Sequence, residues 1–262
     1  MGNIYFQNWG DGIEQALLLH PALATSGIWR GAAKFLKADL SMTAIDLPGH
    51  GKSVDWDQNC DYHTQCTQAA ADFLKSPKHL IGHSFGATVA LRLAVEQPEM
   101  IRSLTLIEPV LFASVRQTPD YDLHEIEFQP FIDLMQRDDK EMAAQVFTQM
   151  WGSGEVWQDI PNAIRQYIVA RIDLIVAGAG GINDDNSGVL SARRLEGLNV
   201  SVLLLQGTQS PRVITAINGA LADRLPNVSQ VQVDGAGHML PVTHSQKVAQ
   251  KIGNFISGSK LP

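Results

Sequence analysis

The chain has 262 residues, of which 45% are hydrophobic and 18% charged, and this predicts one large domain, or one domain with an insertion, around a sizeable core. Twenty Lys and Arg against 27 Asp and Glu give a net charge of -7 without long runs of one sign, which argues against nucleic acid or a membrane surface as a partner. The first residues do not show the basic and apolar segments of a leader peptide, and the most apolar later stretch is interrupted by Arg171 and Asp173. Cys60 and Cys66 are expected to be free thiols. We therefore expect a soluble, cytoplasmic protein.

Short β-rich runs alternate with helical patterns along the chain, which is typical of a parallel sheet covered by helices on both faces. Strands are expected at residues 15–20, 42–46, 79–83, 103–108, 200–206 and 229–233. Helices are expected at about 28–38, 62–75, 85–97, 212–225 and 243–256. The fold class is therefore α/β.

The alternation is interrupted once, between Phe112 and Leu195. No strand pattern occurs there, and amphipathic stretches such as "FQPFIDLMQ" and "EMAAQVFTQMW" predict helices. We therefore expect a core domain made of residues 1–111 and 196–262, with a helical insertion at 112–195. Within the insertion, the glycine-rich stretch at 176–181 follows a helical pattern and is expected to form a loop.

The strongest motif is Gly82-His83-Ser84-Phe85-Gly86, a G-x-S-x-G sequence between an expected strand and an expected helix. The turn in this context is so tight that its central residue takes a strained backbone conformation, and the flanking glycines remove Cβ atoms that would meet neighbouring backbone. The hydroxyl of Ser84 then projects above the carboxyl ends of the strands, near the positive end of the following helix. We predict Ser84 to be a nucleophile.

His238 follows the last expected strand, in a glycine-containing loop from which its imidazole can reach over the edge of the sheet. We predict that it is the base that Ser84 needs. His244 is the competing base, but a capping or packing role is expected for it. His20 and His83 flank strand ends and are expected to contribute shape and hydrogen bonds. No catalytic context is found for the other histidines, His50, His63, His79 and His124.

Five stretches spread along the chain form a recognisable set of motifs: "LLLHPALATSGIW", "AIDLPGHGKS", "GHSFGATVAL", "LTLIEPVLF" and "GAGHMLPVTH". Through them the chain resembles the α/β-hydrolase superfamily over nearly its whole length. The resemblance implies a mostly parallel, eight-stranded sheet flanked by helices, with a helical cap inserted after the sixth strand. It also implies a triad of nucleophile, acid and histidine, and an oxyanion hole made by the backbone N–H groups of Phe85 and Ala22. No metal and no organic cofactor is implied.

The acid of this triad is missing from its usual place. In the superfamily an aspartate usually follows the seventh strand, but Ser210 stands there in this chain. The acid can also follow the sixth strand, which Glu108 ends, and Pro109 is expected to keep the backbone of Glu108 extended. We therefore predict Glu108 as the acid. The alternative is an exposed strand-end glutamate in an ordinary salt bridge.

Other carboxylates rank below Glu108. Asp234 is the second choice for the acid because it lies shortly before His238, although in this fold that place usually only shapes the loop. The remaining candidates are disfavoured by their positions in the expected fold: Asp46, Asp184 and Asp185.

Together, Ser84, His238 and Glu108 predict two-step acyl transfer, in which an acyl group is first bound to the serine and then released by water. The partner is a small-molecule substrate. Its identity would be set by the insertion, whose larger apolar side chains are expected to form mostly insertion core and in part a pocket. These side chains are Phe128, Phe131, Met135, Phe147, Met150, Trp151, Trp157 and Tyr167.

We therefore expect a serine hydrolase that cleaves carboxylic esters of small to medium apolar acyl or aromatic groups. Within the same class, the alternatives are a carbon-carbon bond hydrolase of dienoic ring-cleavage products and a lactonase. Outside it, the alternative is a ligand-binding module that has kept the fold and lost turnover, an alternative favoured by the absent aspartate at position 210.

Overall fold

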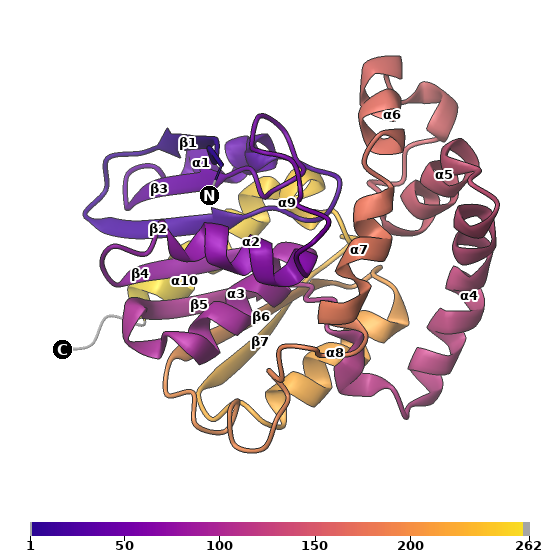
Figure 1. Ribbon diagram of the computed structural model, residues 1–262. Coiled ribbons are helices and arrows are strands. Elements are labelled where there is room, and N and C mark those ends of the chain that lie inside the picture. Colours follow the sequence, from indigo (N-terminus) through magenta and orange to yellow (C-terminus); the bar gives the residue numbers. More distant parts are fainter. Residues whose placement is uncertain (1, 259–262) are drawn as a thin grey trace.

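One sheet of seven strands forms the centre of the chain in the computed structural model, which describes residues 2–258 (Figure 1). The strands are β1 (Phe6–Trp9), β2 (Glu14–Leu19), β3 (Leu40–Ile45), β4 (Lys78–His83), β5 (Ile101–Ile107), β6 (Ser201–Gly207) and β7 (Val228–Val233). They are ordered β1-β3-β2-β4-β5-β6-β7, and within this described part of the chain only β1 pairs antiparallel. The predicted α/β class and mostly parallel sheet are confirmed, with seven described strands in place of eight, so the expected sixth and seventh strands are β5 and β6.

β1 is the strand that the sequence pattern does not predict. It lies at the edge of the sheet, where Phe6 pairs with Ile45, and its residues alternate between exposed and half-buried. An edge strand that buries neither face fully carries no apolar run. The signal on which the other strands were predicted is therefore absent from it.

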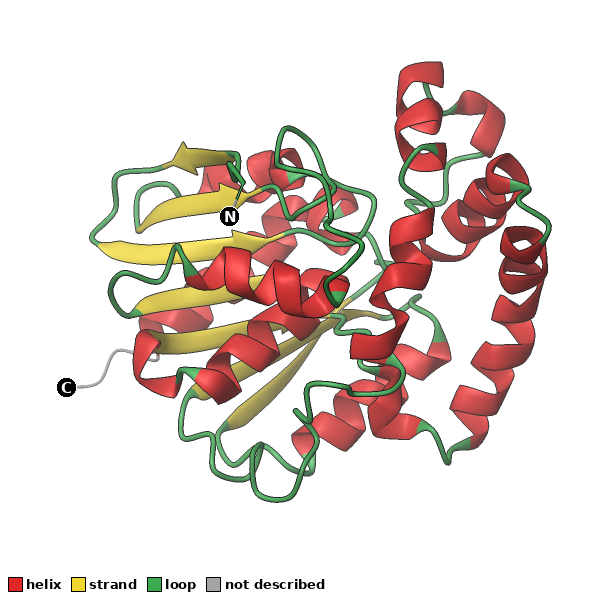
Figure 2. Cartoon of the chain, viewed as in Figure 1, coloured by secondary structure: helices red, strands yellow, loops and turns green. Residues whose placement is uncertain are grey.

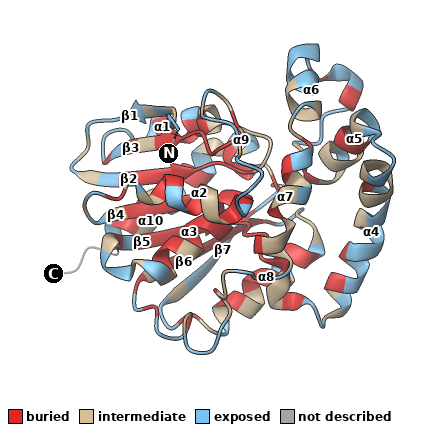
Figure 3. Ribbon diagram, in the orientation of Figure 1, coloured by how far each residue is buried: buried red, intermediate tan, exposed pale blue. Residues whose placement is uncertain are grey.

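Helices cover both faces of the sheet (Figure 2). Because successive side chains of a strand point to opposite faces, β2 divides its side chains between two cores. Leu17 and Leu19 pack with α2 (Tyr62–Ala71), α3 (Phe85–Glu96) and α8 (Arg212–Ala222). Ala16 and Leu18 pack with the helices of the other face, α1 (Arg30–Leu36), α9 (Leu240–Thr243) and α10 (Ser245–Gly258). Figure 3 shows the resulting burial of the central strands.

Four α-helices lie between β5 and β6 in the chain, to one side of the sheet and beyond the carboxyl ends of its strands (Figure 1). They are α4 (Pro119–Gln136), α5 (Lys140–Trp151), α6 (Asn162–Val169) and α7 (Asp173–Ile182). These helices share a small apolar core of their own, which includes Phe131, Trp157 and Ile172. The carboxyl ends of the parallel strands therefore face the helices rather than open solvent.

The glycine-rich stretch at 176–181 is helical, so the prediction of a loop there is wrong: it lies inside α7. The reason is close packing. A Cβ on Gly178 would lie 3.1 Å from the ring of Phe85, and one on Gly181 would lie 2.5 Å from the side chain of His63. Glycine weakens an isolated helix, but here it allows α7 to approach α2 and α3, and tertiary contact overrides local propensity.

Candidate active site

Ser84 stands at the turn between β4 and α3, with φ 54° and ψ −119°. Both flanking glycines are required by their surroundings. A Cβ on Gly82 would lie 2.4 Å from the carbonyl oxygen of Gly86, and a Cβ on Gly86 would lie 2.5 Å from that of His20. No larger residue fits without moving the backbone, so the G-x-S-x-G spacing follows directly from the packing of this turn.

His238, in the loop after β7, lies between Ser84 and Glu108. Its Nε2 is 3.0 Å from the Ser84 Oγ, and its Nδ1 is 2.6 Å from Oε2 of Glu108. A carboxylate only accepts hydrogen bonds, so the Nδ1–H donates to Glu108 and Nε2 is left to accept the serine proton. All three side chains are buried, which strengthens the interaction of the imidazole with the carboxylate.

Glu108 follows β5 and is fully buried, not an exposed strand-end carboxylate. Its Oε1 accepts hydrogen bonds from the backbone N–H of Gly207, at 2.7 Å, and from the hydroxyl of Ser210. The expectation of extended backbone is wrong, because φ of Glu108 is 47°. Its own N–H donates to the carbonyl of Leu205, at 2.9 Å, and its carboxylate bonds to the end of β6 and to His238; these contacts hold the residue in this unusual conformation.

The other carboxylates considered from the sequence lie elsewhere. Asp234 is exposed and contacts Thr208, with 3.5 Å between Oδ1 and Oγ1. Asp46 accepts from the backbone of Ser26 and Lys52. The last two lie within the insertion: Asp184 pairs with Arg116, and Asp185 accepts from the N–H groups of Val189 and Leu190.

Ala22 and Phe85 both line the cavity onto which Ser84 opens. Phe85 is the first residue of α3, and the first N–H groups of a helix have no partner within it. The loop that carries Ala22 is held by two histidines. Nδ1–H of His20 donates to the carbonyl of Pro21 at 2.7 Å, and Nε2 of His50 accepts from the N–H of Leu23 at 2.9 Å. No pattern in the sequence predicts this position for His50.

His83, next to the serine, bonds to the backbone of His238. Its Nε2 donates to the His238 carbonyl at 2.9 Å, and the two ring centroids are 5.0 Å apart. Complete burial lowers the pKa of His83 well below its usual value, so the ring is neutral at pH 7. His244, the competing base, lies between α9 and α10, where its Nδ1 is 2.9 Å from the hydroxyl of Thr243.

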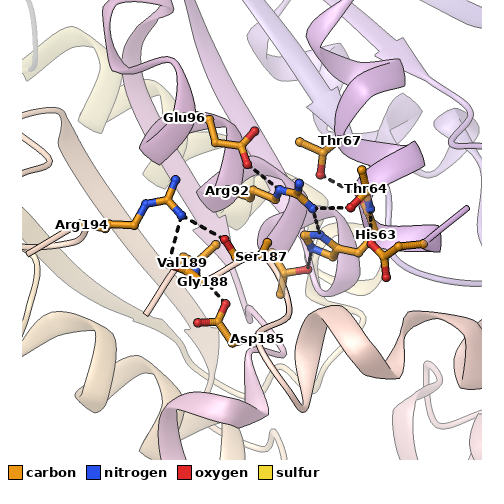
Figure 4. A network of polar contacts seen from close by, with 12 residues as sticks. His63, Thr64, Thr67, Arg92, Glu96, Asp185, Ser187, Gly188, Val189 and Arg194 are labelled. Atoms are coloured by element: carbon orange, nitrogen blue, oxygen red, sulfur yellow. Dashed lines mark hydrogen bonds and ion pairs between the residues drawn. The ribbon is translucent and has the colours of Figure 1, made fainter. Parts of the chain in front are cut away.

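A directed series of hydrogen bonds ends at the carbonyl of Phe85; its outer part, around Arg92 and His63, is drawn in Figure 4. Arg92 donates to Nδ1 of His63 at 3.3 Å, so Nε2 carries the hydrogen and donates to Thr88 at 3.1 Å. The Thr88 hydroxyl donates to the Phe85 carbonyl at 2.7 Å. Burial lowers the pKa of His63 to about 4, in keeping with a neutral ring. Nothing local in the sequence marks this role, since the partners come from α2 and α3.

Above Ser84 lies a mainly apolar cavity of about 130 Å³, hereafter the apolar cavity. Aromatic side chains from the core and from the insertion line it: Phe85, Phe112, Phe128, Phe131, Phe147 and Trp151. Of the insertion side chains singled out from the sequence, Trp157 is buried in the insertion's own core. Tyr167 instead bonds to the backbone of Ala24 and Gly51.

Two absences can be stated for residues 2–258. They contain no group of three or more His, Cys, Asp and Glu side chains that could hold a metal ion. They also contain no helix long and apolar enough to cross a membrane. Cys60 and Cys66 are both free, the first exposed and the second buried.

Residues 16–251 match the sequence family described as "Alpha/beta hydrolase family". The pimeloyl-[acyl-carrier protein] methyl ester esterase of Methylococcus capsulatus is 27% identical over 98% of this chain and 99% of its own. The enzyme of the same name from Nitrosomonas europaea is 35% identical over 41% of each chain. Among solved structures, a thermophilic esterase from Thermogutta terrifontis has a TM-score of 0.75 and 21% identity, covering 99% of this chain and 95% of that one. A carboxylesterase from Bacillus subtilis has a TM-score of 0.69 and 19% identity, covering 98% and 88%.

Proposed function

Because this chain belongs to the alpha/beta hydrolase family, we propose that it hydrolyses carboxylic esters of small to medium apolar acyl or aromatic groups through an acyl-enzyme on Ser84. One observation carries the proposal. The Ser84 hydroxyl, the His238 imidazole and the Glu108 carboxylate form an unbroken hydrogen-bonded series beneath an apolar cavity. A nucleophile, a base within reach of it and a group that orients the base are what covalent acyl transfer requires.

In the first step, Nε2 of His238 removes the hydroxyl proton as the Ser84 Oγ attacks the ester carbonyl carbon. The carbonyl oxygen becomes negative and is stabilised by the backbone N–H groups of Phe85 and Ala22. His238 then gives its proton to the departing alcohol oxygen, and the acyl group stays on the serine. Water, activated by the same imidazole, releases the acid in the second step.

Glu108 takes the role of the acid in this scheme. Its Oε2 fixes the ring of His238 so that Nε2 faces the serine, and its negative charge stabilises the imidazolium formed in each step. The backbone N–H of Gly207 and the hydroxyl of Ser210 hold the other carboxylate oxygen. These bonds hold the carboxylate in place, so that Oε2 stays directed at Nδ1 of His238.

Residues 112–195 act in this proposal as a cap over the core formed by 1–111 and 196–262. The support comes from the cavity, to which the helices between β5 and β6 contribute Phe128, Phe131, Phe147 and Trp151. An apolar cavity of about 150 Å³ holds benzene, and the apolar cavity, at about 130 Å³, is of similar volume, which supports an acyl group of small to medium size.

The test is hydrolysis of p-nitrophenyl butyrate, with fluorophosphonate labelling of the serine as the second readout. Wild-type protein should turn over the ester and be labelled, and Ser84→Ala should do neither while keeping its thermal unfolding midpoint. If dienoic ring-cleavage products or lactones are hydrolysed and simple esters are not, the alternative within the class replaces the ester assignment. A protein that is unlabelled and hydrolyses none of them is a binding module.

A further inference from the structure

His124, on α4, is a buried imidazole that makes no hydrogen bond to any described residue, although only 5% of it is exposed. It is held by rings alone. Phe112 stacks on it with centroids 4.4 Å apart, and Trp151 and Phe128 contact it at 5.7 and 5.4 Å. Buried polar side chains nearly always have a hydrogen-bond partner in the protein, in water or in a ligand, and His124 lines two cavities, so its ring is placed to bind a polar group there.

The ring of His124 is suited to a neutral partner. Burial alone lowers its pKa to about 4, so at pH 7 it is uncharged. A neutral imidazole carries one N–H donor and one acceptor nitrogen. It can therefore donate to a hydroxyl oxygen or accept a hydroxyl hydrogen, whereas an alkyl group would leave both of its nitrogens unsatisfied.

His124 stands where two cavities meet. One is the apolar cavity above Ser84. The other, hereafter the polar groove, has a volume of about 540 Å³ and lies between the insertion and the loops after β6 and β7. His124, His238 and Met239 line both. The polar groove is lined by hydrogen-bonding side chains, among them Asp120, Glu127, Gln149, Gln209, Arg212 and Thr243.

The proposed reaction decides which half of an ester faces the polar groove. His238 protonates the departing oxygen and lines both cavities, whereas Ser84, which keeps the acyl group, lines the apolar cavity and not the polar groove. The alcohol half is therefore placed towards the polar groove. The acyl half then lies in the apolar cavity, among the aromatic rings. A third cavity, of about 760 Å³, reaches Ala22 and Trp151 but is lined by neither Ser84 nor His238, so it does not receive the departing oxygen.

We propose that His124 binds a hydroxyl group of the departing alcohol, and that the substrates are esters of short apolar acids with alcohols that carry a second hydroxyl near the ester oxygen. This inference rests on the proposed ester hydrolysis and narrows it to one class of substrate. The acyl group is selected by apolar contact in the apolar cavity. The alcohol is selected by a hydrogen bond at its mouth, and the remainder of a longer polar alcohol extends into the polar groove.

The experiment compares two esters of equal size, 2-hydroxyethyl butyrate and propyl butyrate, which differ by a terminal hydroxyl in place of a methyl. Wild-type kcat/KM should be at least about tenfold higher for the hydroxyethyl ester, the effect of one hydrogen bond to a buried group. His124→Phe keeps the stacking but not the hydrogen bond, and should bring the ratio of kcat/KM for the two esters close to one. His124→Gln, which keeps a donor and an acceptor, should retain part of the preference.

The outcomes separate the two proposals. Equal wild-type rates on the two esters, or an unchanged ratio in His124→Phe, overturn the inference while leaving ester hydrolysis intact. If neither ester is hydrolysed, ester hydrolysis fails, and the inference is tested by calorimetric titration of Ser84→Ala with both compounds. Equal affinities, or affinities that His124→Phe in the same background does not change, then overturn it. Thermal unfolding of each variant checks that loss of preference is not loss of fold.

Discussion

The hydroxyl of Ser210, at the end of β6, donates a hydrogen bond to the carboxylate of Glu108, at the end of the neighbouring β5. In the superfamily that the sequence resembles, position 210 usually carries the acid itself. The carboxylate that contacts His238 therefore comes from the end of the neighbouring strand, and Ser210, at the usual position of the acid, donates a hydrogen bond to it. The acid of the proposed triad can therefore be tested by substitutions at both Glu108 and Ser210.

Glu108→Gln should lower kcat by up to about 10⁴-fold, the effect of the acid-to-amide change in a serine protease triad. The amide can donate to His238, which stabilises the wrong tautomer and leaves the imidazolium without its counter-charge. KM should change far less. Steady-state kinetics on p-nitrophenyl butyrate measure both, and Asp234→Asn, an exposed carboxylate of the same region, is the matched control. A near-normal Glu108→Gln beside a crippled Asp234→Asn would move the acid to Asp234.

Ser210→Asp, built on Glu108→Gln, should recover part of the lost kcat. The two side chains already touch, so a carboxylate at 210 starts close to the ring of His238. Recovery should be partial, because Arg212 is nearby in sequence and can pair with the new carboxylate. Ser210→Asn in the same background is the control and should recover nothing. Equal rates for the Asp and Asn variants would show that no acid can act from this strand.

The sequence shows some of these features and not others, for physical reasons. The turn around Ser84 is determined by glycines a few residues away, and the alternation of strands is a local pattern, so both could be predicted. The partner of Glu108 at Gly207 and the series from Arg92 through His63 join residues far apart in the chain. No local pattern encodes such contacts. They exist only once the fold places the ends of β5 and β6 side by side and packs α2 against α3.

The free energy of unfolding should fall as pH is lowered from about 6.5 towards 4. Burial lowers the pKa of several histidines, so in the folded state they stay neutral, whereas the unfolded chain takes up protons below about 6.5. Their contribution is complete above that pH and is lost as pH falls, by up to about 1.4 kcal/mol per pH unit for each ring. The pKa is lowered to about 4 for His20, His63 and His124. The pKa is lowered well below its usual value for His50 and His83.

Urea unfolding at pH 7.5, 6.0 and 5.0 measures this dependence. His124→Phe removes one of the titratable imidazoles. The decrease in the free energy of unfolding between pH 7.5 and 5.0 should therefore be smaller by the contribution of one histidine. A free energy of unfolding that does not change between pH 7.5 and 5.0 would mean that these histidines take up protons in the folded state.

Trp151→Ala should shift the preferred acyl length upward, because Trp151 lines the apolar cavity and stands edge-on to His238, with centroids 4.8 Å apart. Removing the indole enlarges the space beside the reacting carbonyl. Trp157→Ala is the matched control: that indole is buried in the insertion's own core, so its loss should lower stability by about 3–5 kcal/mol and leave the order of preference unchanged. Rates across p-nitrophenyl esters from acetate to decanoate, with unfolding midpoints, compare the two. An unchanged acyl preference in Trp151→Ala would remove this residue from the substrate pocket.

His83→Leu should lower kcat by about tenfold with little change in KM. The N–H of His83 holds the carbonyl of His238, and losing it leaves that buried carbonyl unpaired and the catalytic loop free to shift. A substrate held mainly by the apolar cavity would still bind, because the ring of His83 does not line that cavity. His83→Gln can present an amide N–H in the same direction and should recover part of kcat, which a role in packing alone would not give. If Gln and Leu are equally impaired, or if KM rises as much as kcat falls, His83 does not position His238 through this hydrogen bond.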